Sequence, residues 1–291
     1  MTRRAPATPL AAYVLHRWDW SESSLIVDLF TRERGRVAAA AKGAKRPTSQ
    51  LRPVLLPFQR LHAVLGRTPE GESDLHVLRS ADWAPAVADA VAPVPPLAGP
   101  ALLRGFYLNE LLLALLARQD PHPGLFDAYA RTLATLALPH GAGDGGPGAA
   151  ALRAFELVLL RETGVLPDLA TQTLTRAPLA ADACYALHPE AGVVEAPAGA
   201  AAALTGALLT ALESALAARD LAALQQACAR APQPLRTQLR ALLHYHLGSR
   251  PLRTRQVMVE LQRLLPGTAR PARPTREDAA ALPPAAPERP R

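Results

Sequence analysis

The sequence of 291 residues predicts an α+β protein: an N-terminal five-stranded β-barrel followed by an all-α domain with an irregular insert. Up to residue 83, apolar residues alternate with a period of two, which is typical of strands with one buried face. From residue 101, large apolar residues recur at intervals of three and four, which indicates amphipathic helices. We therefore expect a flexible leader over 1–10, the barrel over 11–83, a linker over 84–100, the helical domain over 101–265 and a disordered tail over 266–291.

The barrel is predicted from five short strands within about 75 residues, without a helical crossover, a pattern that favours a small closed barrel. Between the third and fourth strands, Pro53 and Pro57 argue against a helix and place that stretch at a strand edge or bulge. The size matches an oligonucleotide-binding (OB) barrel, in which we expect the loop after the third strand to lie near the binding face. The expected strands are Tyr13–Trp20, Leu25–Phe30, Val37–Ala41, Leu61–Leu65 and Leu75–Trp83.

The second domain is predicted to be helical apart from the insert at 165–197, which loses the helical period and contains four prolines. Within the insert, Cys184–Leu187 and Gly192–Glu195 are typical of a short hairpin. The expected helices are Leu102–Leu115, Leu125–Leu138, Ala149–Thr163, Ala198–Ala218, Leu221–Arg230, Pro234–Leu247 and Leu252–Leu265.

The positive charge is concentrated at the front of the chain. The net charge is +7, and residues 1–60 alone hold eleven cations against four acids, so the remaining residues are neutral in sum. A field concentrated in one small domain attracts a polyanion better than the same charge spread evenly. Nucleic acid is therefore the first candidate partner, and an anionic membrane or an acidic protein is the alternative.

Two cationic segments of the barrel form the candidate site, namely the turn 32–36 and the loop 42–52. Cations that contact phosphates release counterions, which makes affinity fall with salt. Trp18 and Trp20 stand at a strand end, where they are candidates for stacking on bases, whereas Tyr13 and Phe58 are expected in the core. The alternative interpretation is that these cations form a solvated charged surface that binds no ligand. The candidate nucleic-acid-binding residues are Arg34, Arg36, Lys42, Lys45, Arg46 and Arg52.

Metal and cofactor chemistry have no support in the sequence. Cys184 and Cys228 are the only cysteines, too few for a zinc site or a disulfide framework, so we expect a reducing, cytoplasmic setting. His244 and His246 would point to different faces of a helix, and we predict no metal ligand there.

Catalysis has no support either. The chain contains no phosphate loop, dinucleotide fingerprint, nucleophile elbow or zinc-protease helix motif. Its glutamates at 110, 156 and 162 are expected to fix helix packing or to pair with Arg104, Arg153 and Arg161. The longest apolar run is too short to cross a bilayer, which needs about 20 residues. We therefore predict that the protein is not an enzyme, needs no cofactor and binds no membrane.

Several blocks resemble the RecO family of bacterial recombination mediators, and they occur in that family's order. The blocks are Tyr13–Arg17 with Ser21–Arg36, Ala41–Pro47, Leu56–Phe58, Gly105–Leu112, Asp120–Phe126, Leu152–Leu160 and Leu247–Arg255. This resemblance implies an OB barrel followed by a helical domain. It also implies binding to single- and double-stranded DNA, annealing of complementary strands, and nucleoid association.

The resemblance implies protein partners as well. RecO proteins contact the acidic tail of single-stranded DNA-binding protein and act with RecR to load RecA on gapped DNA. We expect the tail in an apolar groove of the helical domain, flanked by cations from among Arg104, Arg118, Arg131 and Arg153. One departure is that many relatives carry a four-cysteine zinc motif in the insert, where this chain has only Cys184.

Two other functions remain open from the residues alone. The same barrel and charge would suit an RNA-binding protein. The other hypothesis is an enzyme with its site in the helical domain. Competition between matched DNA and RNA oligonucleotides distinguishes a DNA-binding protein from an RNA-binding one. A shift in melting temperature on adding nucleotide or metal would indicate the enzyme.

Overall fold

The computed structural model describes residues 8–66, 74–84, 94–138, 146–197, 199–200, 202–248 and 251–264. The chain divides into two units, Met1–Leu252 and Arg253–Arg291. The second unit contributes one described helix, α8 (Arg253–Leu264). The tail over 266–291, most of the leader and residues 85–93 of the linker lie outside the described residues.

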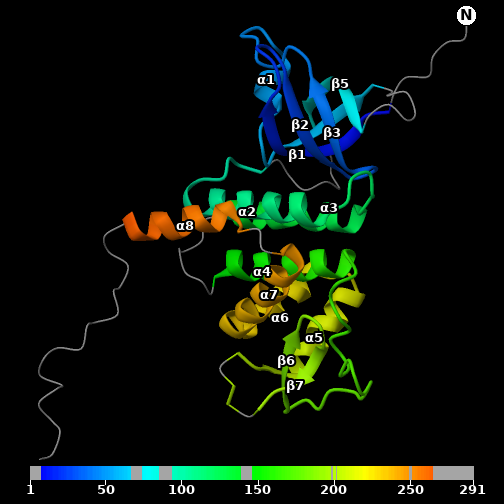
Figure 1. Ribbon diagram of the computed structural model, residues 1–291, viewed down its shortest axis with the longest axis vertical. Coiled ribbons are helices and arrows are strands. Elements are labelled where there is room, and N and C mark those ends of the chain that lie inside the picture. Colours follow the sequence, from blue (N-terminus) through cyan, green and yellow to red (C-terminus); the bar gives the residue numbers. More distant parts are fainter. Residues whose placement is uncertain are drawn as a thin grey trace, which may run out of the picture. The chain divides into compact units, whose positions relative to one another are not determined.

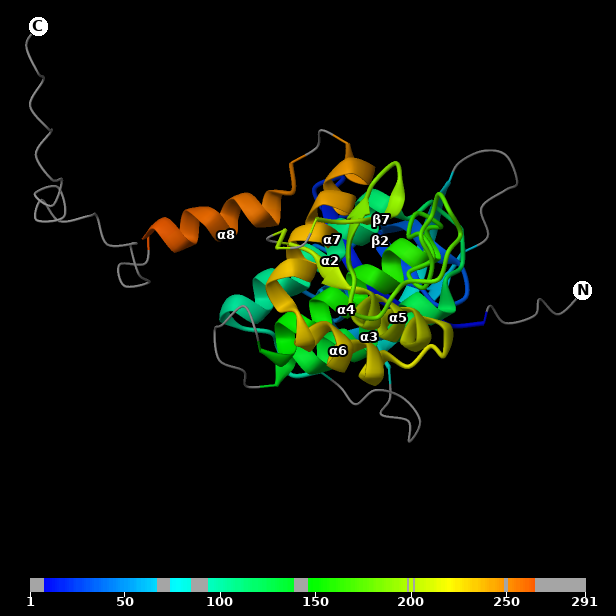
Figure 2. The same ribbon diagram turned by 90° about the horizontal axis from the view of Figure 1, so that it is seen from below.

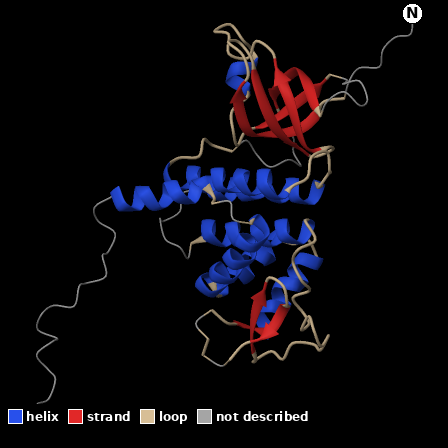
Figure 3. Ribbon diagram, in the orientation of Figure 1, coloured by secondary structure: helices blue, strands red, loops and turns tan. Residues whose placement is uncertain are grey.

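The N-terminal barrel is closed, as the alternating pattern predicts (Figure 1 and Figure 3). Its strands run in the order β1-β2-β3-β5-β4, with antiparallel pairs throughout except for the parallel pair β3–β5. Val27 and Leu29 point into the barrel core, together with Leu61 and Leu55. The strands are β1 (Leu10–Asp19), β2 (Leu25–Thr31), β3 (Gly35–Ala41), β4 (Arg60–Leu65) and β5 (Leu75–Trp83).

One prediction about the barrel is wrong. The segment after the basic loop contains a one-turn helix, α1 (Leu51–Val54), although Pro53 and Pro57 argue against helix there. Pro53 lies in the first turn, where a backbone N–H has no helical acceptor, so the missing donor costs no helical hydrogen bond. Pro57 follows the helix and makes a bridge to Val14 of β1.

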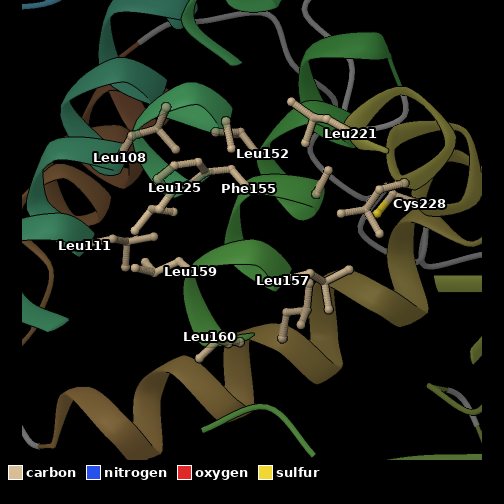
Figure 4. Packing of buried hydrophobic residues seen from close by; sticks show 14 of the residues in the cluster. Leu108, Leu111, Leu125, Leu152, Phe155, Leu157, Leu159, Leu160, Leu221 and Cys228 are labelled. Atoms are coloured by element: carbon tan, nitrogen blue, oxygen red, sulfur yellow. The ribbon is translucent and has the colours of Figure 1, made fainter. Parts of the chain in front are cut away.

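The helical domain of the first unit is built around α4, which packs against α3 on one side and against α6 and α7 on another (Figure 1 and Figure 2). Phe155, Leu159 and Leu160 of α4 are fully buried, and Figure 4 shows them among leucines of the neighbouring helices. The helices are α2 (Gly99–Leu115), α3 (Pro123–Ala137), α4 (Pro147–Glu162), α5 (Gly206–Ala217), α6 (Leu221–Arg230) and α7 (Pro232–Leu247).

The insert contains the predicted hairpin, β6 (Cys184–His188) with β7 (Gly192–Glu195). A third strand, β8 (Leu204–Thr205), pairs with β6, which explains why α5 begins after the helix start predicted at Ala198. Gln238 of α7 ties this sheet to the domain, because its amide accepts from Leu187 N–H at 3.0 Å and donates to the Ala202 carbonyl at 2.8 Å. Hydrogen bonds and packing therefore hold the insert.

The barrel and the helical domain share one hydrophobic core. Tyr13 and Phe30 point outward from β1 and β2 and pack on Phe126 and Tyr129 of α3, with ring centroids 5.0–6.1 Å apart. Burial raises the pKa of Tyr13 to about 12. Among the described residues, no helix is long and apolar enough to span a membrane.

Candidate nucleic-acid interface

Two loops meet at the end of the barrel where β1 ends and β2 begins. Strand pairing places Asp19 opposite Leu25 and Leu25 opposite Ala41, so the turn 20–24 lies beside the loop that leaves β3. We call residues 20–24 and 42–52 together the rim. The rim includes the first two residues of α1, Leu51 and Arg52, and contains four of the six predicted nucleic-acid-binding residues.

Three cations of the rim are presented to solvent. Lys42, Arg46 and Arg52 are exposed, and within the described chain none of their side chains takes part in a hydrogen bond or an ion pair. Gly43, between the two lysines, has φ +71°, a left-handed conformation that glycine adopts without strain. Its N–H donates to the hydroxyl of Ser24 at 3.3 Å, which fixes the start of the loop against the neighbouring turn.

Lys45 has a different environment from Lys42. Its ammonium donates to the Ser21 carbonyl at 3.1 Å and lies 3.2 Å from a carboxylate oxygen of Asp19. Its backbone N–H donates to the Ser23 carbonyl at 2.9 Å. Lys45 therefore braces the two loops of the rim against each other, so part of its charge is already paired.

The aromatic residues divide as predicted. Tyr13 and Phe58 are 1% and 3% exposed and belong to the core shared with the helices. Trp18 and Trp20 are 40% and 50% exposed, and the Trp18 ring meets the His16 ring edge-on at 4.4 Å. A third exposed tryptophan, Trp83 at the end of β5, lies opposite Leu61 of β4. The first two are available beside the rim for stacking on bases.

A hollow of about 460 Å³ lies between the end of the β1–β2 ribbon and α1. Arg17, on its wall, donates to the Leu55 carbonyl at 3.0 Å, which holds that guanidinium in place. Burial differs around the hollow, because Leu55 and Ala44 are buried whereas Arg17, Asp19 and Arg52 are exposed. The lining residues are Arg17, Asp19, Leu25, Ala44, Lys45, Arg52 and Leu55.

The turn 32–36 lies at the opposite end of β3, a strand of seven residues or roughly 23 Å at 3.3 Å per residue. There Arg36 pairs with the fully buried Asp28 through both carboxylate oxygens, at 3.2 and 3.3 Å. Arg36 also donates to the carbonyls of Leu113 and Leu116, near the end of α2. Arg36 therefore stabilises the junction between barrel and helices, and its side chain is only 15% exposed.

The rest of that turn is docked on the helical domain as well. Arg32 makes two hydrogen bonds to Asp127 of α3, each 3.0 Å. Gly35, with φ +64°, lies so close to the Asp120 carbonyl that a side chain there would clash. Arg34 alone among the cations of this turn is exposed without an ion pair in the described chain. The predicted site is thus divided between two ends of the barrel.

The four arginines proposed for an acidic tail have different surroundings. Arg153 is mostly buried and pairs with Glu156 at 2.8 Å, as the sequence predicts. Arg118 lies 3.8 Å from Asp28, on the barrel side. Arg104 has its guanidinium beside Gly148 at the start of α4, and Arg131 is exposed on α3.

Three further expectations from the sequence concern metal binding, a reactive thiol and the pairing of Glu162. Among the described residues, no group of three or more His, Cys, Asp or Glu side chains could hold a metal ion. Burial raises the pKa of the Cys228 thiol to about 12, so it is a core residue rather than a nucleophile. The predicted pairing of Glu162 with Arg161 is wrong, since Glu162 lies 3.1 Å from His122 and Arg161 pairs with Glu213.

These features define the class of protein: a closed OB-type barrel with a basic rim, fused to a helical domain that carries a small sheet. Two family profiles match the chain, "Recombination protein O N terminal" over residues 8–86 and "Recombination protein O C terminal" over residues 99–256. The first match covers the barrel, and the second covers the helical domain of the first unit and the start of α8.

Similar proteins agree with this assignment. The DNA repair protein RecO of Verminephrobacter eiseniae is 51% identical over 257 residues, covering 87% of this chain and 96% of the relative. Those of Variovorax paradoxus and Acidovorax ebreus are each 52% identical, over 261 and 259 residues, with the same coverage. The chain belongs to the RecO family of DNA repair proteins.

Proposed function

We propose that the rim binds the backbone of single-stranded DNA and that the protein uses this binding to anneal complementary strands. The observation that carries the proposal is the placement of Lys42, Arg46 and Arg52, exposed and without ion pairs in the described chain, beside two exposed tryptophans. A cationic groove with stacking aromatics is the recurring arrangement of single-strand binders.

Annealing follows from charge neutralisation. Two complementary strands repel each other through their phosphates, and cations bound to one strand lower that repulsion for the second. Binding through three exposed cations needs no nucleotide hydrolysis. Lys45 contributes indirectly, because its bonds to the Ser21 carbonyl and Asp19 keep the two loops of the rim together.

The wider role that we propose is that of a recombination mediator. In this role the protein acts with RecR to help RecA load on single-stranded DNA coated by single-stranded DNA-binding protein. Arg104, Arg118, Arg131 and Arg153 remain our candidates for contacting the acidic tail of that protein, and Arg131 is exposed on α3. Alanine at Arg104 and Arg131 should weaken binding of an acidic tail peptide and leave DNA affinity unchanged.

The test of the rim is strand annealing, measured with bare DNA and with DNA coated by single-stranded DNA-binding protein. The variant Lys42→Ala/Arg46→Ala/Arg52→Ala should bind single strands more weakly and anneal more slowly. Arg79→Ala/Arg230→Ala/Arg240→Ala is the matched control, since it removes the same number of exposed charges outside the rim. If both variants lose annealing equally, total charge rather than the rim governs binding, and the proposal fails.

An RNA-binding role is the competing proposal, since phosphates and bases of RNA would suit the same rim. The family match favours DNA. Competition between DNA and RNA oligonucleotides of one sequence decides the point, and tighter binding of RNA would overturn the proposed substrate.

A further inference from the structure

The hollow beside the rim combines two kinds of surface that a simple phosphate site would not have together. Its floor is apolar and consists of Leu25, Ala44 and Leu55. Its wall carries the cations Arg17, Lys45 and Arg52 and one carboxylate, Asp19. A carboxylate repels a bare phosphate, and an apolar floor gives a phosphate nothing to bind, so the expected ligand has an apolar face as well as a negative charge.

The position of the hollow follows from the alternation of β1. Trp18 pairs with Ile26 on the outer side of the ribbon, while its neighbours Arg17 and Asp19 point to the inner side, toward α1. Since Arg17 pairs with Val27 of the barrel core, the hollow lies just beyond that core, at the open end of the barrel. It is therefore a separate surface from the tryptophans.

The size and charge of the hollow fit one unpaired nucleotide. Ligand sites are commonly about 300–1,000 Å³, mostly apolar with a few polar groups, and the hollow of about 460 Å³ falls in that range. Arg17 and Arg52 are exposed at the wall, where they can meet the phosphates of the chain that enters and leaves. One oxygen of the Asp19 carboxylate pairs with Lys45, and the other can accept a hydrogen bond from a base with an exocyclic amino group.

We propose that the hollow takes a single base out of a DNA strand, seating it on Leu25 and Leu55 while Arg17 and Arg52 hold its flanking phosphates. This inference rests on the proposed function and deepens it. It makes the site specific for single strands, because a base within a duplex is stacked and paired and must be extruded before it can enter. It also separates base binding at the hollow from stacking on Trp18 and Trp20.

The experiment compares two strands of equal charge: an oligo(dC) and an abasic oligonucleotide of the same length. The full-length protein should bind oligo(dC) more tightly by roughly tenfold or more, the scale of one to two base contacts. In the variant Leu25→Phe, which narrows the hollow where the base would sit, this preference should fall several-fold while affinity for the abasic strand and for duplex stays the same. Leu25 is only half-buried in a strand, where phenylalanine is well tolerated.

Two controls make the result specific to the hollow. Trp20→Ala lowers the base preference through loss of stacking, and its effect should add to that of Leu25→Phe, because separate contacts are independent. Photocrosslinking of a strand carrying a halogenated cytosine to the unchanged protein needs no variant, and its products should map to peptides around Leu25 or Leu55. Free deoxycytidine monophosphate carries only one of the two flanking phosphates and should displace the strand only weakly.

Each outcome has a defined meaning. A base preference that Leu25→Phe reduces, with crosslinks at the hollow, supports the inference. A preference that depends only on Trp18 and Trp20 overturns it and leaves binding at the rim intact. If the unchanged protein binds neither oligonucleotide, the proposed function itself fails.

Discussion

Cationic residues lie at both ends of β3, but their surroundings at the two ends are opposite. At the rim, Lys42 and Arg46 extend into solvent with no ion pair in the described chain. At the other end, Arg36 is enclosed by Asp28 and the last carbonyls of α2, and Arg32 is bound to Asp127. Both sets contribute equally to the net charge, yet only the rim presents it. Charge counted along the chain is therefore not the charge that a ligand meets.

The difference comes from what the barrel packs against. The turn between β2 and β3 packs against α2 and α3, where a buried charge without a partner would be costly. Arg32 and Arg36, which reach the helices, therefore have an acid or a carbonyl as partner, whereas Arg34 is exposed. The rim faces away from the helices in the first unit (Figure 1). Its cations keep their water until a phosphate replaces it, which is what a reversible polyanion site requires.

The largest effect is expected from Arg36→Ala. The substitution leaves Asp28 buried with only the longer contact to Arg118, and breaking a buried pair in this way costs about 3–5 kcal/mol. Chemical or thermal unfolding should show this loss, while the salt dependence of DNA binding should keep its slope. A folded variant with normal stability and weaker DNA binding would reverse the comparison and return Arg36 to the interface.

The triple rim variant Lys42→Ala/Arg46→Ala/Arg52→Ala should behave in the opposite way. We expect the slope of log affinity against log salt to become shallower by about two, since each single-strand phosphate contact contributes roughly 0.7. Stability should change by less than about 0.5 kcal/mol, because these side chains have no partners to lose. Filter binding across a salt series measures the first effect, and an unchanged slope would contradict the division of the barrel.

Two buried carboxylates sharpen the comparison, because one is fully paired and the other is not. Glu156 accepts from Tyr107 and Arg153 through one oxygen, while its other oxygen has no hydrogen-bond partner among the described residues. Burial raises the pKa of Glu156 in spite of the nearby Arg153. The folded state therefore holds this proton more tightly than the unfolded state does, and folding loses stability as the pH rises through the unfolded pKa of Glu156 toward its folded pKa.

The substitution Glu156→Gln should consequently gain stability relative to the unchanged protein as the pH rises from 4 toward 7. Asp28→Asn should lose stability relative to the unchanged protein near neutral pH, because it leaves Arg36 without a counter-charge. Melting curves of Glu156→Gln at several pH values, and of Asp28→Asn near neutral pH, compare the two signs directly. A stability of Glu156→Gln that does not rise with pH relative to the unchanged protein would show that the second oxygen of Glu156 is satisfied after all.

Sequence patterns predicted local features well and pairing between distant residues poorly. The alternation of β2 correctly placed Val27 and Leu29 in the barrel core. It gave no sign that Asp28 and Phe30, on the other face, meet Arg118 and Phe126, 90 and 96 residues further along the chain. The structure shows Lys42, Arg46 and Arg52 of the rim exposed, and it shows Arg36 at the turn held by a distant partner. DNA binding by these residues stays a prediction.

Other differences have the same origin. The helix α6 was predicted to the residue, since its capping Asp220 and its apolar period are local. The start of α5 was missed because β8 exists only through its pairing with β6. The hollow beside the rim depends on α1, which the prolines concealed. Asp19 was a clue in the sequence to an ion pair, because an acidic residue among cations at a loop junction often forms one. Its partner Lys45 could not be predicted, because the strand register decides which cation lies beside it.

The smallest effect concerns the two lysines, the only ones in the chain and three residues apart. Lys45→Ala removes an ion pair with the exposed Asp19 and one hydrogen bond, which should cost only about 0.2–1 kcal/mol. Lys42→Ala should leave stability unchanged and lower the salt slope by roughly 0.7, as expected for one phosphate contact.

Amine-reactive labelling, read by mass spectrometry, should modify Lys42 before Lys45, because the Lys45 ammonium must first leave Asp19 and the Ser21 carbonyl. Bound single-stranded DNA should protect Lys42 more than Lys45, since only Lys42 would exchange water for phosphate. Equal protection of both would mean that DNA opens the brace, and the rim would then be a site that forms on binding rather than one that the fold prepares.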